Sequence, residues 1–170
     1  IHPYNNYNVI YGQATCAKEI YESKIFLDYI IIPVGGGGLA SGTILATQVF
    51  SPSTKVVLAE PLNASDAFES FKSRKLITVN NPNTIADGLK TSLGDKTFKI
   101  IINGAHEIVT VTEKEIIDSM KLIWERLKII CEPSCSLPLA VVLKNRPKYQ
   151  NKSVGLILTG GNVDLLNLPF

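Results

Sequence analysis

The stretch YIIIPVGGGG, residues Tyr29–Gly38, decides the fold class of this chain. Its first part, Tyr29–Val34, is a continuous apolar run of strand length, which is typical of a strand buried on both faces of a parallel sheet. The glycines Gly35–Gly38 end this run, and a helix-like segment at 39–49 follows them directly. We therefore expect a strand, a glycine turn and a helix in succession, the unit from which parallel sheets are built.

The rest of the chain repeats this alternation of strand-like and helix-like segments. The further predicted strands are 55–60, 107–111 and 154–159, and the predicted helices are 12–22, 39–49, 67–73, 113–128 and 137–143, with a polar loop at 80–83. The last of these helices is expected to start near Pro138, because proline suits a first helical turn. The pattern predicts an α/β fold with a mostly parallel, twisted sheet flanked by helices.

The segment at 113–128 has the most pronounced helical pattern. Thr112 and Glu115 fit a capping box, which satisfies two free amide groups at a helix start. Ile116, Met120, Ile123 and Leu127 then fall at helical spacing on one face. A stripe of this kind is typical of core packing, so we expect these four side chains to be buried.

The bulk composition limits the class of protein. The chain has 170 residues, 45% hydrophobic and 19% charged, ordinary values for one globular domain, and its net charge of +2 gives no argument for nucleic-acid binding. No apolar run is long enough to cross a bilayer, and no signal peptide is evident. Cys16, Cys131 and Cys135 form neither a zinc pattern nor a disulfide framework. They predict reduced thiols and a cytoplasmic location.

The glycine turn is the first candidate site. Residues without Cβ let the backbone approach a ligand closely, and their amides, together with a helix N-terminus, can bind a phosphate dianion. The alternative is a flexible turn without a ligand. The sequence around Gly35–Gly38 matches neither the dinucleotide fingerprint nor a P-loop, since no lysine follows at the required position.

Two other strand ends carry polar groups. Thr159 precedes Gly160 and Gly161, and its hydroxyl could hydrogen-bond a heterocyclic nitrogen, or merely cap a tight turn. Glu60 ends the second predicted strand, and Asp66 follows within a short turn. Two carboxylates with a main-chain carbonyl can hold a hard cation. Alternatively, Asp66 caps the helix predicted at 67–73.

These segments together resemble the serine racemase and threonine dehydratase family of fold-type II pyridoxal-phosphate (PLP) enzymes. Each motif alone is weak, but several occur in the family's order and at compatible spacing across essentially the whole chain. The matching segments are GQAT at 12–15, PVGGGGL at 33–39, AEPLNASD at 59–66, TIADGLK at 84–90, WER at 124–126, CEPS at 131–134 and LTGGNVD at 158–164. Ala14 stands where the family has glycine, and Thr159 where it usually has serine.

The resemblance implies a cofactor site. Gly35, Gly36, Gly37, Gly38 and the amide of Leu39 would hold the PLP phosphate. Gly88 would lie against the cofactor ring, Thr159 would meet the pyridine nitrogen, and Glu132 would place a carboxylate nearby.

The resemblance implies two further binding sites. Glu60, Asp66 and the Ala64 carbonyl would bind Mg²⁺ or Ca²⁺. Lys128 and Asn162 match positions that contact an activating nucleotide, ATP, at the interface of a homodimer.

The resemblance also implies that residues 1–170 are the C-terminal part of the large PLP-binding domain. The lysine that holds the cofactor and the serine base on the opposite face are expected upstream, so we assign no catalytic residue within the chain. Ile1 in place of methionine fits a fragment or a processed product.

The implied activity is racemisation and/or β-elimination of serine, with a small amino acid as substrate. Two alternatives are open: an L-threonine/L-serine ammonia-lyase without racemase activity, or a non-catalytic PLP- or metal-binding fragment.

Overall fold

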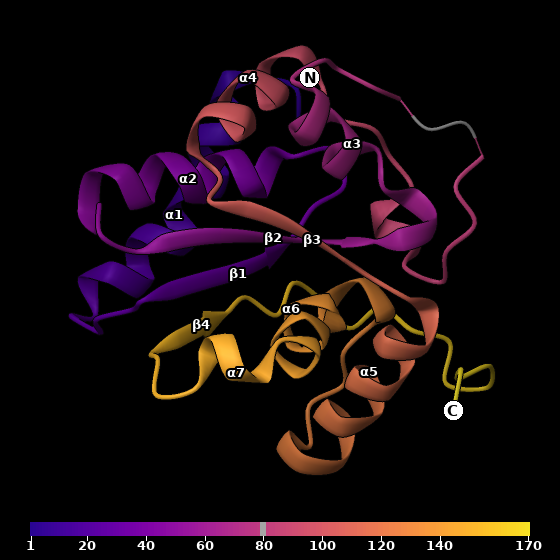
Figure 1. Ribbon diagram of the computed structural model, residues 1–170. Coiled ribbons are helices and arrows are strands. Elements are labelled where there is room, and N and C mark those ends of the chain that lie inside the picture. The colour runs from indigo at the N-terminus through magenta and orange to yellow at the C-terminus, as the bar shows by residue number, and fades with distance from the viewer. Residues whose placement is uncertain (79–80) are drawn as a thin grey trace.

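A computed structural model describes residues 1–78 and 81–170 of the chain (Figure 1). The predicted polar loop at 80–83 begins outside these residues. The described part forms a sheet with helices on both faces, as Figure 1 shows. The prediction of an α/β fold with a parallel sheet is therefore confirmed.

In the described residues the sheet contains four strands in the order β3-β2-β1-β4, and all three pairings are parallel. Its strands are β1 (Tyr29–Pro33), β2 (Lys55–Pro61), β3 (Glu107–Val111) and β4 (Val154–Leu156). Every residue of β1 is buried, as expected for a central strand covered on both faces. The carboxyl ends of the strands meet at one edge of the sheet, so the turns that follow them can build a common site.

Two helical layers cover the sheet. The helices α1 (Tyr7–Glu22), α2 (Gly38–Phe50), α3 (Asp66–Ser73) and α4 (Asp95–Gly104) lie on one face, and α5 (Glu113–Leu127), α6 (Pro133–Lys144) and α7 (Arg146–Tyr149) lie on the other (Figure 1). Successive side chains of a strand point to opposite faces. Ile30 and Ile32 accordingly join the first layer, and Ile31 joins the second.

The capping box at the start of α5 is confirmed. Thr112 accepts a hydrogen bond from the Glu115 amide, and Glu115 accepts one from the Thr112 amide at 2.7 Å. Ile116, Met120 and Ile123 are fully buried as predicted. The expectation for Leu127 is wrong: its side chain is exposed, because α5 ends there and the chain turns away.

Several predicted boundaries are wrong. Helix α6 begins at Pro133, and this proline rather than Pro138 occupies the first turn. Helix α1 begins earlier than predicted, because the Asn6 side chain caps it by accepting the Asn8 amide at 2.9 Å. Strand β4 ends at Leu156 rather than at Thr159, since in the described sheet the last residue of β4 paired in register with β1 is Leu156.

None of the helices in the described ranges is both long and apolar enough to cross a membrane.

Candidate functional site

A pocket of about 410 Å³ opens beside the glycine turn at the carboxyl end of β1. All the predicted cofactor residues line it, namely Gly35–Gly38, Leu39, Gly88, Glu132 and Thr159. They come from four separate segments of the chain, so the fold brings together residues that are far apart in sequence. We call this cavity the glycine-loop pocket.

The glycine turn forms one wall of the pocket. Gly37 has φ of +87°, a left-handed conformation that side chains other than glycine rarely adopt. The Thr97 hydroxyl donates to the Gly36 carbonyl at 2.8 Å and so fixes the turn. Helix α2 starts at Gly38, and the first amides of a helix have no partner within the helix. The wall therefore presents amide donors and the positive end of a helix, which suits a phosphate group.

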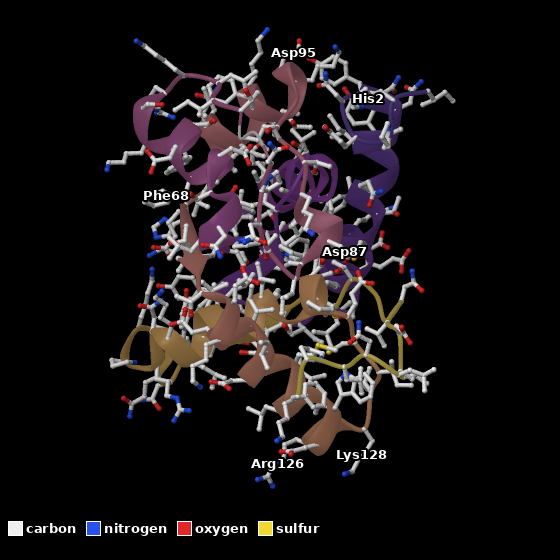
Figure 2. The ribbon with its side chains drawn as sticks, turned by 90° about the vertical axis from the view of Figure 1, so that its right-hand side faces the viewer. His2, Phe68, Asp87, Asp95, Arg126 and Lys128 are labelled. Carbon is white, nitrogen blue, oxygen red and sulfur yellow. The ribbon has the colours of Figure 1, made fainter. Side chains whose placement is uncertain are left out.

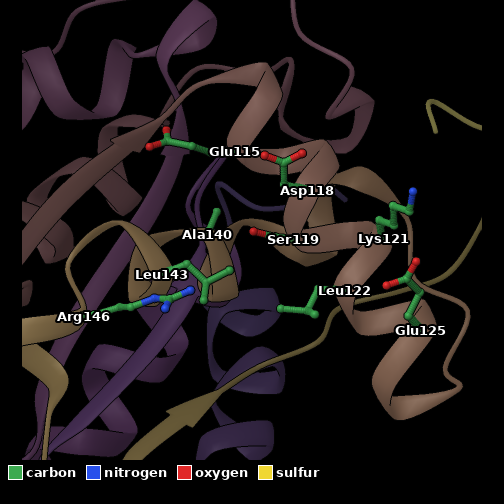
Figure 3. Close-up of a pocket in the computed structure, with 9 residues that line it drawn as sticks. All are labelled: Glu115, Asp118, Ser119, Lys121, Leu122, Glu125, Ala140, Leu143 and Arg146. Carbon is green, nitrogen blue, oxygen red and sulfur yellow. The ribbon is translucent and has the colours of Figure 1, made fainter.

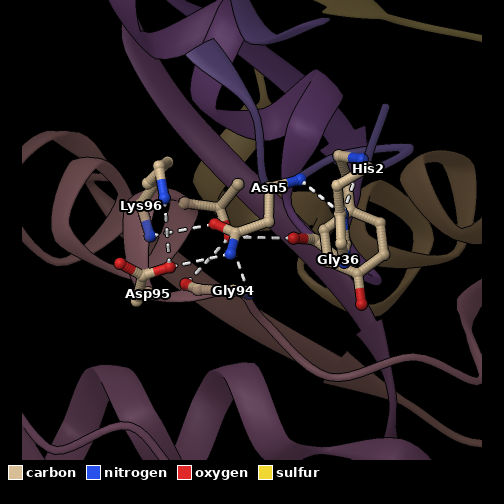
Figure 4. Close-up of polar contacts among 8 residues, drawn as sticks. His2, Asn5, Gly36, Gly94, Asp95 and Lys96 are labelled. Carbon is tan, nitrogen blue, oxygen red and sulfur yellow. Dashed lines mark hydrogen bonds and ion pairs between the residues drawn. The ribbon is translucent and has the colours of Figure 1, made fainter.

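The N-terminal segment lies across this wall. A Cβ atom on Gly36 would overlap the Tyr4 ring, so the ring rests directly on the glycine turn. Asn5 anchors the segment to α4 (Figure 4): its amide nitrogen donates to Asp95 at 2.7 Å, and its oxygen accepts from the Lys96 amide at 3.0 Å. Tyr4 thus narrows the pocket, a role that sequence reasoning did not assign to it.

The opposite wall is built from the 3-10 helix η2 (Asp87–Leu89) and the start of α6. The Gly88 amide donates to Asp87 at 2.9 Å and to the Ser134 hydroxyl at 3.2 Å. A Cβ atom on Gly88 would lie 3.1 Å from the Ser134 oxygen, closer than ordinary packing. Glycine therefore allows η2 to contact α6 closely.

Glu132 holds the turn that contains Thr159. Its amide donates to the Gly160 carbonyl at 3.1 Å, and its carboxylate accepts from the Asn162 amide at 3.1 Å. The Thr159 side chain itself is exposed to the pocket side of this turn. The turn is therefore held by Glu132 at the start of α6, and the Thr159 side chain lies at the pocket.

Two buried cysteines lie behind the same turn. A hydrogen bond from the Cys131 thiol, with further ones from the Gly160 and Thr159 amides, lowers the pKa of Cys135. The same thiol–thiol hydrogen bond raises the pKa of Cys131. Neither cysteine forms a disulfide.

The predicted metal turn brings two carboxylates into the protein interior. Glu60 at the end of β2 is fully buried, and its oxygens accept from the Ala67 and Phe68 amides at 2.7 and 2.8 Å. Asp66 is also buried. Burial raises the pKa of Glu60 to about 8 and that of Asp66 to about 6. No lysine, arginine or histidine in the described residues pairs with either carboxylate.

These contacts show that the alternative role of Asp66, as the cap of the helix predicted at 67–73, is wrong. Asp66 is the first residue of α3 rather than its cap, and the side chain that binds the first amides of α3 comes from Glu60. The described residues hold no group of three or more histidine, cysteine or acidic side chains suited to a metal. The predicted metal site is not a group of this type, because it has only two carboxylates and takes its third ligand from the Ala64 main-chain carbonyl. Such an oxygen-only set would suit a hard cation.

Lys128 and Asn162, the candidate nucleotide residues, are both exposed. Lys128 ends α5 in a left-handed conformation, and Figure 2 shows it at the opposite end of the molecule from His2. A Cβ atom on Gly161 would overlap the Ile130 carbonyl, so the loop after Lys128 runs against the turn before Asn162. The two residues therefore belong to neighbouring segments.

A second cavity, of about 400 Å³, lies between α5 and α6 (Figure 3). Ser119 and Leu122 on α5 face Ala140 and Leu143 on α6 across it. None of the predicted site residues lines this cavity. It is a groove between packed helices, distinct from the pocket at the strand ends.

Comparison with known protein families identifies the family of this chain. The family described as "Pyridoxal-phosphate dependent enzyme" matches residues 1–160. The chain belongs to this family. The resemblance on which the sequence prediction rested is therefore confirmed.

The similar members of the PLP-dependent family include racemases and dehydratases. A beta-hydroxyaspartate dehydratase of Paracoccus denitrificans is 49% identical over 170 residues, which cover 100% of this chain and 54% of that protein. A serine racemase of Dictyostelium discoideum is 48% identical, covering 99% of this chain and 53% of that protein. The chain thus spans about half the length of the curated relatives it matches.

Solved structures of the PLP-dependent family agree with the fold. The crystal structure of the Dictyostelium discoideum serine racemase matches with a TM-score of 0.91 over 97% of this chain and 54% of that chain. The structure of maize serine racemase matches with a TM-score of 0.93 at 40% identity, over 97% of this chain and 52% of that one.

Proposed function

We propose that the complete protein, meaning this chain with whatever its coding sequence places before Ile1, catalyses PLP-dependent racemisation and/or β-elimination of serine. The observation that carries the proposal is the convergence of all predicted cofactor residues on one pocket, in a chain of the PLP-dependent family. Assaying the complete protein with L-serine for D-serine and pyruvate tests it. Absence of both products would contradict it.

The residues around the pocket suit pyridoxal phosphate. The amides of Gly35–Gly38 and Leu39 would bind its phosphate dianion, and the bare backbone of Gly88 would lie against its flat ring. Glu132 would hold the turn that brings the Thr159 hydroxyl to the ring nitrogen. When bound, the cofactor supplies an electron-withdrawing ring that weakens the bonds at the α-carbon of an amino acid.

One relative favours a second candidate, β-elimination of a 3-hydroxy amino acid. The relative that is 49% identical is named a beta-hydroxyaspartate dehydratase. A parallel assay with threonine and 3-hydroxyaspartate, measuring the 2-oxo acid and ammonia, separates the candidates. Elimination without any D-serine would favour the ammonia-lyase alternative.

Thr159 provides a mechanistic test. A neutral hydroxyl cannot keep the ring nitrogen protonated, whereas a carboxylate can, so Thr159 would leave the ring a weaker electron acceptor and favour elimination. In the complete protein we expect Thr159→Ser to be nearly neutral. Thr159→Asp should shift the cofactor's absorption band and lower turnover by about 10-fold or more. Equal activity and equal spectra in all three proteins would place Thr159 away from the ring.

We also propose that Glu60, Asp66 and the Ala64 carbonyl bind Mg²⁺ or Ca²⁺. The support is chemical: burial without a counter-charge makes the charged forms of Glu60 and Asp66 costly and raises both pKa values, and a divalent cation would stabilise those charged forms.

The metal proposal predicts a cation-dependent melting temperature. Adding Mg²⁺ or Ca²⁺ at about 100 times its dissociation constant should raise the melting temperature of the complete protein by roughly 5 °C or more. Asp66→Ala should remove this response, because it deletes one ligand. Asp118→Asn, at an exposed carboxylate on α5, is the matched control and should keep it. An intact response in Asp66→Ala would exclude Asp66 as a ligand.

The nucleotide site, the homodimer and the cytoplasmic location stay proposals. The contact between the loop after Lys128 and the turn before Asn162 supports a shared site for ATP, and titration of the complete protein with ATP tests it.

A further inference from the structure

Ser134 is a pocket residue to which the sequence assigned no role. It lies in the first turn of α6, and its side chain is almost completely buried. It lines the glycine-loop pocket together with Gly88, Glu132 and Thr159. A buried hydroxyl in such a place needs hydrogen-bond partners, because leaving it without them costs free energy.

Its oxygen has a defined partner. The Gly88 amide donates to the Ser134 hydroxyl at 3.2 Å, while also donating to the Asp87 carboxylate at 2.9 Å. The Asp87 contact is local to η2, whereas the contact with Ser134 joins η2 to α6. Ser134 is therefore the side chain that ties Gly88, the proposed backbone surface for the cofactor ring, to the helical layer beneath it.

No hydrogen bond among the described residues 1–78 and 81–170 uses the hydroxyl hydrogen of Ser134. A serine hydroxyl can donate one hydrogen bond while it accepts others. Among the hydrogen bonds of residues 1–78 and 81–170, Ser134 acts only as an acceptor. Ser136, on the same helix, differs: its hydroxyl donates to the Ile116 carbonyl at 3.0 Å and to the Pro133 carbonyl at 2.9 Å. Within the part of the chain that the structure describes, the Ser136 hydroxyl uses its donor capacity and the Ser134 hydroxyl does not.

We propose that Ser134 is a positioning residue of the cofactor site, which holds Gly88 at the pocket wall and offers a hydrogen-bond donor to the group that occupies the pocket. The inference rests on the proposed function and adds to it a specific residue on the ring side. The contact with Ser134 also gives a physical reason for glycine at position 88. A side chain there would press against the Ser134 hydroxyl, which holds the Gly88 amide.

The test compares Ser134→Ala, Ser134→Thr and Ser136→Ala in the complete protein. PLP is titrated into the cofactor-free form to obtain its dissociation constant, the absorption band of the bound cofactor is recorded, and melting of the cofactor-free form reports on folding. Ser134→Ala should raise the dissociation constant about 3- to 10-fold and shift the band, because it loses the contact with Gly88 and the free donor. Ser134→Thr should stay within about 2-fold of wild type, since it keeps the hydroxyl.

Ser136→Ala is the matched control on the same helix. It should lower the melting temperature through its lost hydrogen bonds, yet leave the dissociation constant and the band unchanged. A Ser134→Ala protein with the wild-type dissociation constant for PLP and the wild-type absorption band would overturn this inference and leave the proposed function standing. If Ser134→Ala does not fold, a folded Ser134→Thr protein with weakened binding would overturn it too. A wild-type complete protein that binds no PLP would overturn the proposed function, and this inference with it.

Discussion

Replacing Gly42 with alanine is expected to lower the free energy of unfolding by about 2–4 kcal/mol. Gly42 lies in α2 where α1 crosses it, and a Cβ atom there would lie 2.6 Å from both the Ala14 nitrogen and the Ile10 carbonyl oxygen. These are backbone atoms, so no change of rotamer relieves the overlap and α1 must move as a whole. Since α2 begins in the glycine turn and α1 follows the segment of Tyr4, this movement should also distort the glycine-loop pocket.

Gly12→Ala is the matched control for this prediction. Gly12 lies inside α1, and a Cβ atom there would meet nothing within 4 Å. Alanine in a helix interior is favoured over glycine, so this variant should gain about 0.5–1 kcal/mol. Both variants are made in the complete protein, and their free energy of unfolding is measured by urea unfolding followed by circular dichroism. A Gly42→Ala protein as stable as wild type would show that α1 and α2 separate without cost, contrary to their observed packing.

The strands could be predicted because their signal is local. Two strands were recognised from residue types within a few positions, namely the apolar run at Tyr29–Val34 and the strand at 107–111. Strand β3 (Glu107–Val111) has the predicted bounds. Features set by distant contacts were missed. The length of β4 depends on its pairing with β1, and the exposure of Leu127 depends on the direction of the chain after α5. Helix α4 (Asp95–Gly104) was not predicted, although the sequence contains a signal for it. Phe98, Ile101 and Ile102 recur there at helical spacing.

The same distinction applies to the candidate site. Gly35–Gly38 and Thr159 could be proposed because glycines and a hydroxyl that follow strand-like segments indicate their chemistry by residue type alone. Ser134 could not, because its role comes from a contact with Gly88, 46 residues away in sequence. Glu60 was predicted as an acidic ligand, but its hydrogen bonds to the first amides of α3 depend on how the turn after β2 folds. Residue type thus indicated the ligand chemistry, while the fold determined which groups support it.

The 170-residue chain by itself is expected to have no racemase or ammonia-lyase turnover. Covalent catalysis with PLP needs a lysine amine that reaches the cofactor. No lysine of the described residues lines the glycine-loop pocket. The pocket can still bind the phosphate weakly, because amide donors at a helix start need no lysine. The expected result is therefore weak binding of PLP without product.

The isolated chain should also aggregate readily. Strands β3 and β4 form the two edges of the sheet, and unpaired edges favour association. Large apolar side chains, including Phe26, Ile130 and Leu166, are exposed as well. Low solubility would therefore accompany inactivity, so inactivity must be measured on material shown by light scattering to be monodisperse. Without that check, absent product would report aggregation rather than the missing amine.

The decisive experiment adds PLP and L-serine to the monodisperse chain and assays pyruvate and D-serine, with the complete protein measured in parallel. Borohydride reduction followed by mass spectrometry then reports any lysine that has reacted with the cofactor. We expect no product and at most scattered, substoichiometric labelling of surface lysines, because every lysine lies outside the pocket wall in the described residues. Turnover together with one stoichiometric lysine adduct would contradict the prediction. It would mean that a lysine of this chain, such as Lys90 beside η2, reaches the cofactor and serves as the catalytic amine.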